Sequence, residues 1–256
     1  MGKVLYKKNS ILESIIQIKF PQILALKNED PIQFQSLIRE TFPIYQLSIE
    51  KQHEIAFNIE REPTLAKILQ SQQIKNHNFI STDGHYKINL TSGFISISTV
   101  KYDSWENIID LFSKPMESFL KIYQPPFFER VGLRYIDGFS KKKLNLETCL
   151  WRDLIAPQWL GGYNLIEDEN KVLTSNLEVE YVLDDGISHA KIRSGLGMNN
   201  NEKIFLLDSD FIHIGNINIK SYGYILEQLH AYAKEFIDAA ITQKLHEAME
   251  PEENEN

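Results

Sequence analysis

The sequence predicts an α+β protein made of two tandem strand-helix-strands-helix units, whose strands form one or more antiparallel sheets with long helices on one face. Three observations predict this fold class. Apolar and polar residues alternate with a period of two along many segments, which is typical of strands with one buried face. Long amphipathic helical patterns close each half of the chain, at 104–123 and at about 220–248. The two halves also show the same order of elements.

In the first half, residues 11–20 alternate as a strand, and residues 31–42 open on a proline and space their apolar residues as a short helix. Residues 47–60 are interpreted as one or two strands and 61–73 as a short helix or a loop. Strands at 78–90 and 92–100, with turn signals at DG and SG, precede the helix at 104–123. Ser104 is placed to cap this helix, and Pro115 should kink or split it.

The second half begins with a strand at 127–139 and continues with a short helix at 146–156 and a loop. Three more strands are predicted, at 172–183, 188–197 and 202–215. The closing helix at 220–248 presents one apolar stripe. These elements divide the chain into a first unit at 1–125, a second unit at 126–248 packed with it as one body, and a disordered acidic tail at 249–256.

An internal repeat supports this division. Residues 94–120 align without a gap with residues 211–237, so that Phe94 corresponds to Phe211 and Ser104 to Ser221. Chance is the competing explanation, because any amphipathic strand followed by a helix gives some matches. We favour a duplication as the interpretation.

Composition narrows the classes of function. The formal net charge of −8 disfavours bulk nucleic-acid binding, which normally needs a basic surplus. The single cysteine, Cys149, excludes an internal disulfide and suits a reducing cytoplasm. The N-terminus has no apolar segment of signal-peptide length, and no run of apolar residues is long enough to span a membrane. We therefore expect a cytoplasmic protein without a membrane partner.

The strand at 127–139, FFERVGLRYIDGF, alternates in an unusual way. Val131, Leu133 and Tyr135 share one side, whereas Arg130, Gly132 and Arg134 share the other. The strands that follow add charges of both signs, and together these residues form the candidate binding site: Arg130, Gly132, Arg134, Lys191, Arg193, Glu178 and Glu180.

Two interpretations of this charged side stay open. The charges could be cross-strand ion pairs on a solvated face. Alternatively, the arginines could recognise a carboxylate, a phosphate or an acidic protein segment. A glycine within a strand marks a bulge, a close approach by another group, or a place where an aromatic side chain lies across the strand.

Catalytic motifs are missing from the sequence. It contains no G-x-x-x-x-G-K-[ST], H-E-x-x-H or G-x-S-x-G segment, so we assign no catalytic residue and expect no cofactor. Asp208 and Asp210 lie two apart on a predicted strand, with His213 close in sequence. A divalent metal site there is a weak alternative, and we favour a salt bridge, a bulge or a strand end instead.

Residues 130–137, RVGLRYID, resemble the R-[IV]-G-L-R-Y-x-[ND] signature of an uncharacterised, sporadically distributed family of bacterial proteins. Weaker matches extend over most of the chain, at SILESIIQIKF without the expected proline, at Trp105-Glu106, at LLDSDF and at FIDAAITQKLHEAM. The patchy distribution of the family suggests mobile genes, such as those of defence systems. The resemblance supplies no catalytic residue.

The leading hypothesis is a non-enzymatic binding or accessory protein of the bacterial cytoplasm, and the resemblance suggests that it belongs to a mobile or defence-type gene set. An open, charged sheet face would recognise a protein segment or a small anionic ligand, and the partner would be another protein or a second copy. The alternatives are a hydrolase that holds phosphate-bearing substrates with the arginines, and a structural subunit of a larger assembly that associates through sheet edges or helices.

Overall fold

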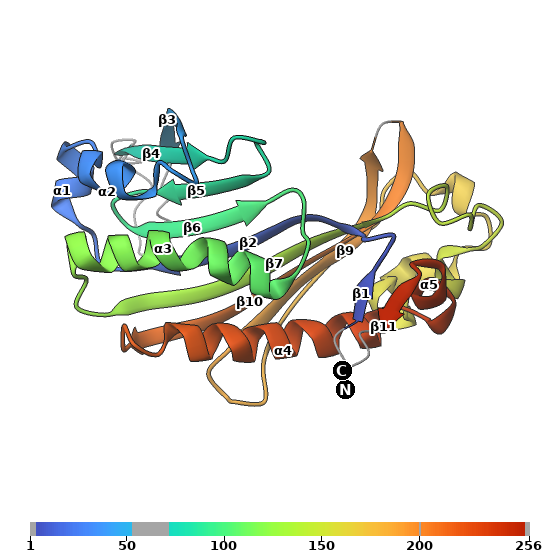
Figure 1. Ribbon diagram of the computed structural model, residues 1–256. Coiled ribbons are helices and arrows are strands. Elements are labelled where there is room, and N and C mark those ends of the chain that lie inside the picture. Colours follow the sequence, from blue (N-terminus) through green and yellow to red (C-terminus); the bar gives the residue numbers. More distant parts are fainter. Residues whose placement is uncertain (1–3, 53–71, 200, 254–256) are drawn as a thin grey trace, which may run out of the picture.

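The computed structural model describes residues 4–52, 72–199 and 201–253. Its dominant feature is one antiparallel sheet of nine strands (Figure 1). From edge to edge, the strands are β3 (Ile44–Gln52), β4 (Gln72–Ile80), β5 (Tyr86–Leu90), β6 (Phe94–Thr99), β2 (Ile11–Lys19), β7 (Phe128–Phe139), β10 (Glu202–Ile217), β9 (His189–Asn199) and β8 (Asn176–Val182). A separate pair joins the chain ends, where β1 (Val4–Tyr6) lies antiparallel to β11 (Pro251–Glu253).

Helices are few in the described residues. The α-helices are α1 (Leu24–Asn28), α2 (Ile32–Ile38), α3 (Trp105–Tyr123), α4 (Tyr222–Ala240) and α5 (Gln243–Ala248). Four short 3-10 helices occupy the connection between β7 and β8: η1 (Trp151–Asp153), η2 (Pro157–Trp159), η3 (Gly161–Leu165) and η4 (Glu169–Lys171). None of the described helices has both the length and the apolar character needed to cross a membrane.

The predicted fold class is wrong. The molecule is mostly sheet, and its strands belong to one continuous structure rather than to an α+β arrangement of tandem units with long helices on one face. The two strands that begin the expected units, β2 and β7, are direct neighbours in the middle of the sheet. Alternation in sequence locates strands, but the choice of neighbouring strand depends on contacts between residues far apart in the chain, which the local pattern does not contain.

The strand order runs outward from this central pair in a regular way. On one side of the centre it is β2-β6-β5-β4-β3, and on the other it is β7-β10-β9-β8. The segments aligned in the sequence fall on β6 with α3 and on the end of β10 with α4. The duplication that the alignment suggests stays a prediction.

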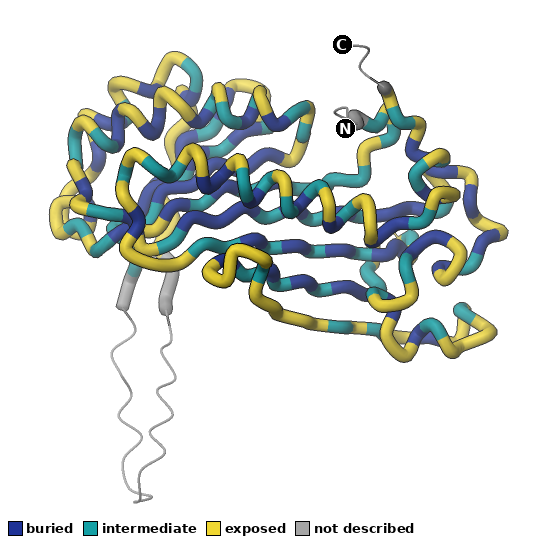
Figure 2. The backbone as a smooth tube through the Cα atoms, turned by 90° about the horizontal axis from the view of Figure 1, so that it is seen from below, coloured by how far each residue is buried: buried dark blue, intermediate teal, exposed yellow. Residues whose placement is uncertain are grey.

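The core lies between the sheet and the helices. Val131, Leu133 and Tyr135 face this core from β7, and Phe119 of α3 and Leu229 of α4 cover it. Figure 2 shows the central strands mostly buried and the two long helices alternating between buried and exposed positions. Each large apolar side chain removed from water contributes about 1.5–3 kcal/mol, so this layer is the main source of stability.

Several elements differ from those predicted. The helix at 104–123 is not split, because α3 runs through Pro115. The closing helix ends at Ala240, where Ile241 turns extended before α5 begins. The short helix expected at 146–156 is reduced to η1. Pro251–Glu253, in the tail expected to be disordered, pair with β1, and residues 254–256 lie outside the described residues. Residues 53–71, where we expected the end of a strand and then a short helix or a loop, also lie outside them.

Candidate functional site

The arginines of β7 are paired with aspartates of the neighbouring strand. Arg134 donates from Nε and Nη2 to both carboxylate oxygens of Asp208, at 2.7 Å each. Arg130 donates to Asp210 at 3.0 and 3.1 Å and to the side-chain oxygen of Gln17 at 2.8 Å. The antiparallel register of β10 and β7 puts Asp210 directly opposite Arg134, so both aspartates share the face of the arginines, and each arginine bonds an aspartate diagonally across from it. The hydrogen bond to Asp208 is the main reason that the pKa of Arg134 is raised.

The outer strands extend this network. Arg193 bonds Glu178 at 2.6 Å and also reaches Asp208 at 3.2 Å. Lys191 lies 2.8 Å from Glu178 and 3.8 Å from Glu180. The six charged candidate residues and the two aspartates thus form one ladder across four strands, with four cations facing four anions. We call it the charge ladder.

Gly132 allows Arg130 to lie across the strand. A Cβ atom at position 132 would come within 2.8 Å of the guanidinium carbon of Arg130. The pairings of β7 are regular at this position, so the glycine does not mark a bulge. Of the three roles considered for it, the close approach of another group is the one that the geometry bears out, and that group is the neighbouring arginine.

The described residues offer no further ligands for the metal site considered at Asp208 and Asp210. Asp208 and Asp210 share the face of the charge ladder, and their oxygens accept from arginines. Alternation along β10 turns His213 to the other face, where its Nδ1 lies 2.8 Å from the hydroxyl of Ser188. In the part of the chain that the structure describes, no three acidic, histidine or cysteine side chains are grouped to hold a metal ion.

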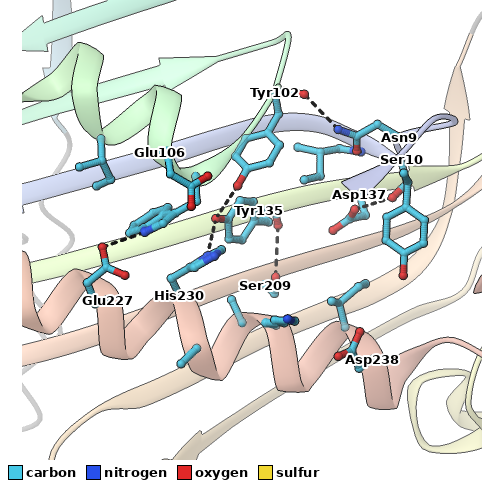
Figure 3. A pocket seen from close by; sticks show the side chains of 18 of the residues that line it. Asn9, Ser10, Tyr102, Glu106, Tyr135, Asp137, Ser209, Glu227, His230 and Asp238 are labelled. Atoms are coloured by element: carbon cyan, nitrogen blue, oxygen red, sulfur yellow. Dashed lines mark hydrogen bonds between the residues drawn. The ribbon is translucent and has the colours of Figure 1, made fainter. Parts of the chain in front are cut away.

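A cavity of about 960 Å³ lies on the other face of the sheet, between α3, α4 and the central strands (Figure 3). Its floor is formed by residues of β7 and β10, its walls by both long helices, and one end by the segment after β1. None of the candidate residues predicted from the sequence lines it.

At one end of the cavity, aromatic side chains connect the two helices. Trp105, the first residue of α3, donates from its indole nitrogen to Glu227 of α4 at 2.9 Å. Its ring stacks on His230, with centroids 4.3 Å apart and an angle of 5° between the planes. The hydroxyl of Tyr135 lies 3.1 Å from Nδ1 of His230 and 3.4 Å from the hydroxyl of Tyr102. Helices and sheet are thereby held at a defined separation.

At the other end, Asp137 of β7 is buried, with 5% of its surface exposed. It accepts a hydrogen bond from the hydroxyl of Ser10 at 2.7 Å. Burial raises the pKa of Asp137 to about 6, and the bond from Ser10 opposes this shift. Burial, followed by the charges of Asp238 and Asp137, raises the pKa of the nearby Tyr6 to about 12. Figure 3 shows Asp137 on the sheet side and Asp238 on α4.

Sequence reasoning missed this cavity because its residues come from at least five separated parts of the chain. One signal was available. Asp137 continues the apolar series of Val131, Leu133 and Tyr135 on the buried side of β7, and a carboxylate in such a position needs an explanation.

A scan against protein-family models found no matching family, and a search of curated proteins found no match. The resemblance of residues 130–137 to a bacterial family therefore stays a prediction.

Proposed function

We propose that the protein is a non-enzymatic binding protein whose ligand is a small, largely apolar organic molecule held in the cavity between α3, α4 and the central strands. The observation that carries the proposal is the cavity itself. Its volume of about 960 Å³ is at the upper end of the range typical of small-molecule sites. Its lining combines aromatic and aliphatic side chains with polar and charged ones, and apolar walls with placed polar groups are typical of such sites.

The charge ladder supports an anion-binding role less well. An anion arriving at Arg130 or Arg134 would have to displace Asp210 or Asp208, which already make bonds of 2.7–3.1 Å. The same competition weighs against a hydrolase that holds phosphate with these arginines. We therefore assign the charge ladder to the packing and register of the sheet.

The cavity groups are bonded in a way that supports binding rather than catalysis. Ser10 donates its hydroxyl hydrogen to a carboxylate, and no histidine among the described residues is hydrogen-bonded to it, whereas a nucleophilic serine needs a general base. Tyr135 and His230 bond each other and join the helices to the sheet. We assign these groups to the shape of the cavity.

The test uses Nile red, a neutral dye whose emission rises in apolar surroundings. We expect saturable binding to the protein. Ala231 on α4 lines the cavity and is exposed, whereas Ala239 is exposed on the same helix and does not line the cavity. Ala231→Trp should weaken dye binding at least tenfold, whereas Ala239→Trp should leave it unchanged.

Both substitutions place the same bulky residue at an exposed helical position, so a general effect on folding would appear in both. Circular dichroism melting curves would verify that each variant is folded. Failure of the wild-type protein to bind the dye saturably, or full binding by Ala231→Trp, would refute the proposed site.

A further inference from the structure

We infer that the ligand of this cavity carries a positively charged nitrogen that pairs with Asp137, so that the ligand class is an organic amine with an aromatic or aliphatic body. The inference rests on the proposed function, because it assigns a chemistry to the ligand of the same cavity.

Asp137 differs from the other largely buried carboxylates in lacking a cationic partner. Asp208 is paired with Arg134, Asp210 with Arg130, and Glu169 with Lys141 at 2.7 Å. Asp137 accepts one hydrogen bond, from Ser10, and within the described ranges no lysine, arginine or histidine lies within ion-pair distance of it. Burying a carboxylate lowers the stability of the protein unless a cation pairs with it, so Asp137 is placed to pair with a cationic group of a ligand.

The charges around Asp137 favour a cation over an anion. Four more carboxylates line the cavity, namely those of Glu106, Asp110, Glu227 and Asp238. Among the described lining residues, Lys234 is the one lysine and there is no arginine. A cavity lined mainly by one sign of charge concentrates the opposite sign and repels its own, so a carboxylate or phosphate ligand is disfavoured.

The aromatic side chains fit the body of such an amine. Tyr102 and Tyr135 meet edge to face, with ring centroids 5.6 Å apart and an angle of 87°, and Trp105 closes the far end. Tyr6 lines the cavity at the Asp137 end, and its hydroxyl lies 2.8 Å from Nδ1 of His246. Aromatic faces attract cations as well as flat apolar groups. An ammonium group at Asp137 would thus have tyrosine rings beside it, and the body of the ligand would extend toward the end of the cavity marked by Glu227 and His230 (Figure 3).

The experiment compares three compounds of nearly equal shape by isothermal titration calorimetry at neutral pH. Tryptamine carries an ammonium group, tryptophol a neutral hydroxyl and indole-3-propionate a carboxylate. We expect tryptamine to bind at least tenfold more tightly than tryptophol, and indole-3-propionate to bind most weakly. Asp137→Asn should reduce the preference for tryptamine over tryptophol to about twofold or less, without weakening tryptophol.

Two control variants separate charge from packing. Asp184→Asn removes an equal charge from an exposed hairpin turn, and it should keep the preference for tryptamine. Ser10→Ala keeps the charge of Asp137 and removes its hydrogen bond, so it should also keep that preference.

The outcomes distinguish the two proposals. Equal binding of tryptamine and tryptophol, both weakened by Ala231→Trp, would overturn the amine inference and leave the proposed function standing. An equal loss of both compounds in Asp137→Asn would likewise overturn it, since the carboxylate would then act through packing. If Nile red and the indoles all fail to bind saturably, the proposed function fails and the inference fails with it.

Discussion

Asp137 connects sequence, stability and the proposed function at the scale of a single residue. A carboxylate buried without a cation lowers the stability of the folded protein, and residues retained at such a cost are often found at functional sites. Here the local cause is simple, because alternation along β7 turns position 137 toward the helices. A leucine in its place would extend the apolar core, whereas the aspartate leaves a charge in a cavity.

This cost should appear as a dependence of stability on pH. The pKa of Asp137 is about 6 in the folded protein and near its ordinary 3.8 in the unfolded chain, so the folded state binds the proton more tightly. The stability gained from this tighter proton binding is fully present below about pH 4 and is lost as the pH rises through about 6. The free energy of unfolding of the Asp137→Asn variant should therefore be roughly 2–3 kcal/mol higher than that of the wild-type protein at pH 7.

Urea unfolding of both proteins between pH 4 and pH 7 would measure this difference, which should nearly vanish at the acidic end. Burial raises the pKa of Tyr6 and of Tyr102 to about 12, so these neighbours stay protonated throughout. Parallel stability curves for the two proteins would contradict the prediction.

The effect of a substitution at Gly132 on the free energy of unfolding should depend on whether Arg130 is present. In the wild-type protein, Gly132→Ala would displace the guanidinium from Gln17 and Asp210 and cost about 1 kcal/mol. In an Arg130→Ala background the same change should be neutral or stabilise by roughly 0.5 kcal/mol, because glycine weakens a strand. A double-mutant cycle of urea unfolding would give a coupling of about 1 kcal/mol.

Gly93 is the control for this cycle, because a Cβ atom there would meet nothing within 4 Å. Gly93→Ala should show no coupling with Arg130. If the effects of Gly132→Ala and Arg130→Ala on the free energy of unfolding are additive, the conformation of the arginine does not require the glycine.

At the scale of elements, the two long helices begin on corresponding serines but start differently. Ser104 is extended, and its side chain accepts a hydrogen bond from the backbone nitrogen of Asn107 at 3.1 Å. Ser221 has a helical backbone conformation and makes no capping bond with its side chain. The same residue type therefore has different roles at the starts of α3 and α4.

Ser104→Ala should lower the free energy of unfolding by about 1 kcal/mol, since one backbone N–H group of α3 loses its partner. Ser221→Ala should change it by less than about 0.3 kcal/mol, because no capping bond is lost. Chemical unfolding followed by far-UV circular dichroism measures both. Equal effects of the two substitutions would show that the capping geometry does not control these helix starts.

At the scale of the whole molecule, one sheet connects everything that the sequence divides. β7 pairs with β2 of the first half on one side and with β10 of the second half on the other. A separate unfolding of either half would expose a long central strand with unpaired backbone groups. We therefore expect one cooperative transition in place of two.

The three tryptophans make this testable. Trp105 lies in the first half, and Trp151 and Trp159 lie in the second. In Trp105→Phe, the remaining tryptophans report on the second half. In the double variant Trp151→Phe/Trp159→Phe, the remaining tryptophan reports on the first half. In each variant, the urea midpoint from tryptophan fluorescence should coincide with the midpoint from far-UV circular dichroism. Fluorescence midpoints that differ from the circular dichroism midpoint of the same variant would indicate independent units.

Local pattern was enough to determine several features of this protein from its sequence. It located the strand at 127–139, placed Val131 and Arg130 on opposite faces, and identified Ser104 as the cap of a long helix. Each of these depends on residues within a few positions of one another, where the periods of strand and helix operate directly.

Only the tertiary structure decided which strands became neighbours, and the partners of the arginines and the cavity follow from that choice. Asp208 and Asp210 meet Arg134 and Arg130 because β10 lies beside β7 in one register. Asp137 became a cavity residue because segments from both chain ends and both long helices converge above it. Such contacts join residues more than 70 positions apart, and their free energy depends on the packing of the whole sheet, which no local pattern records.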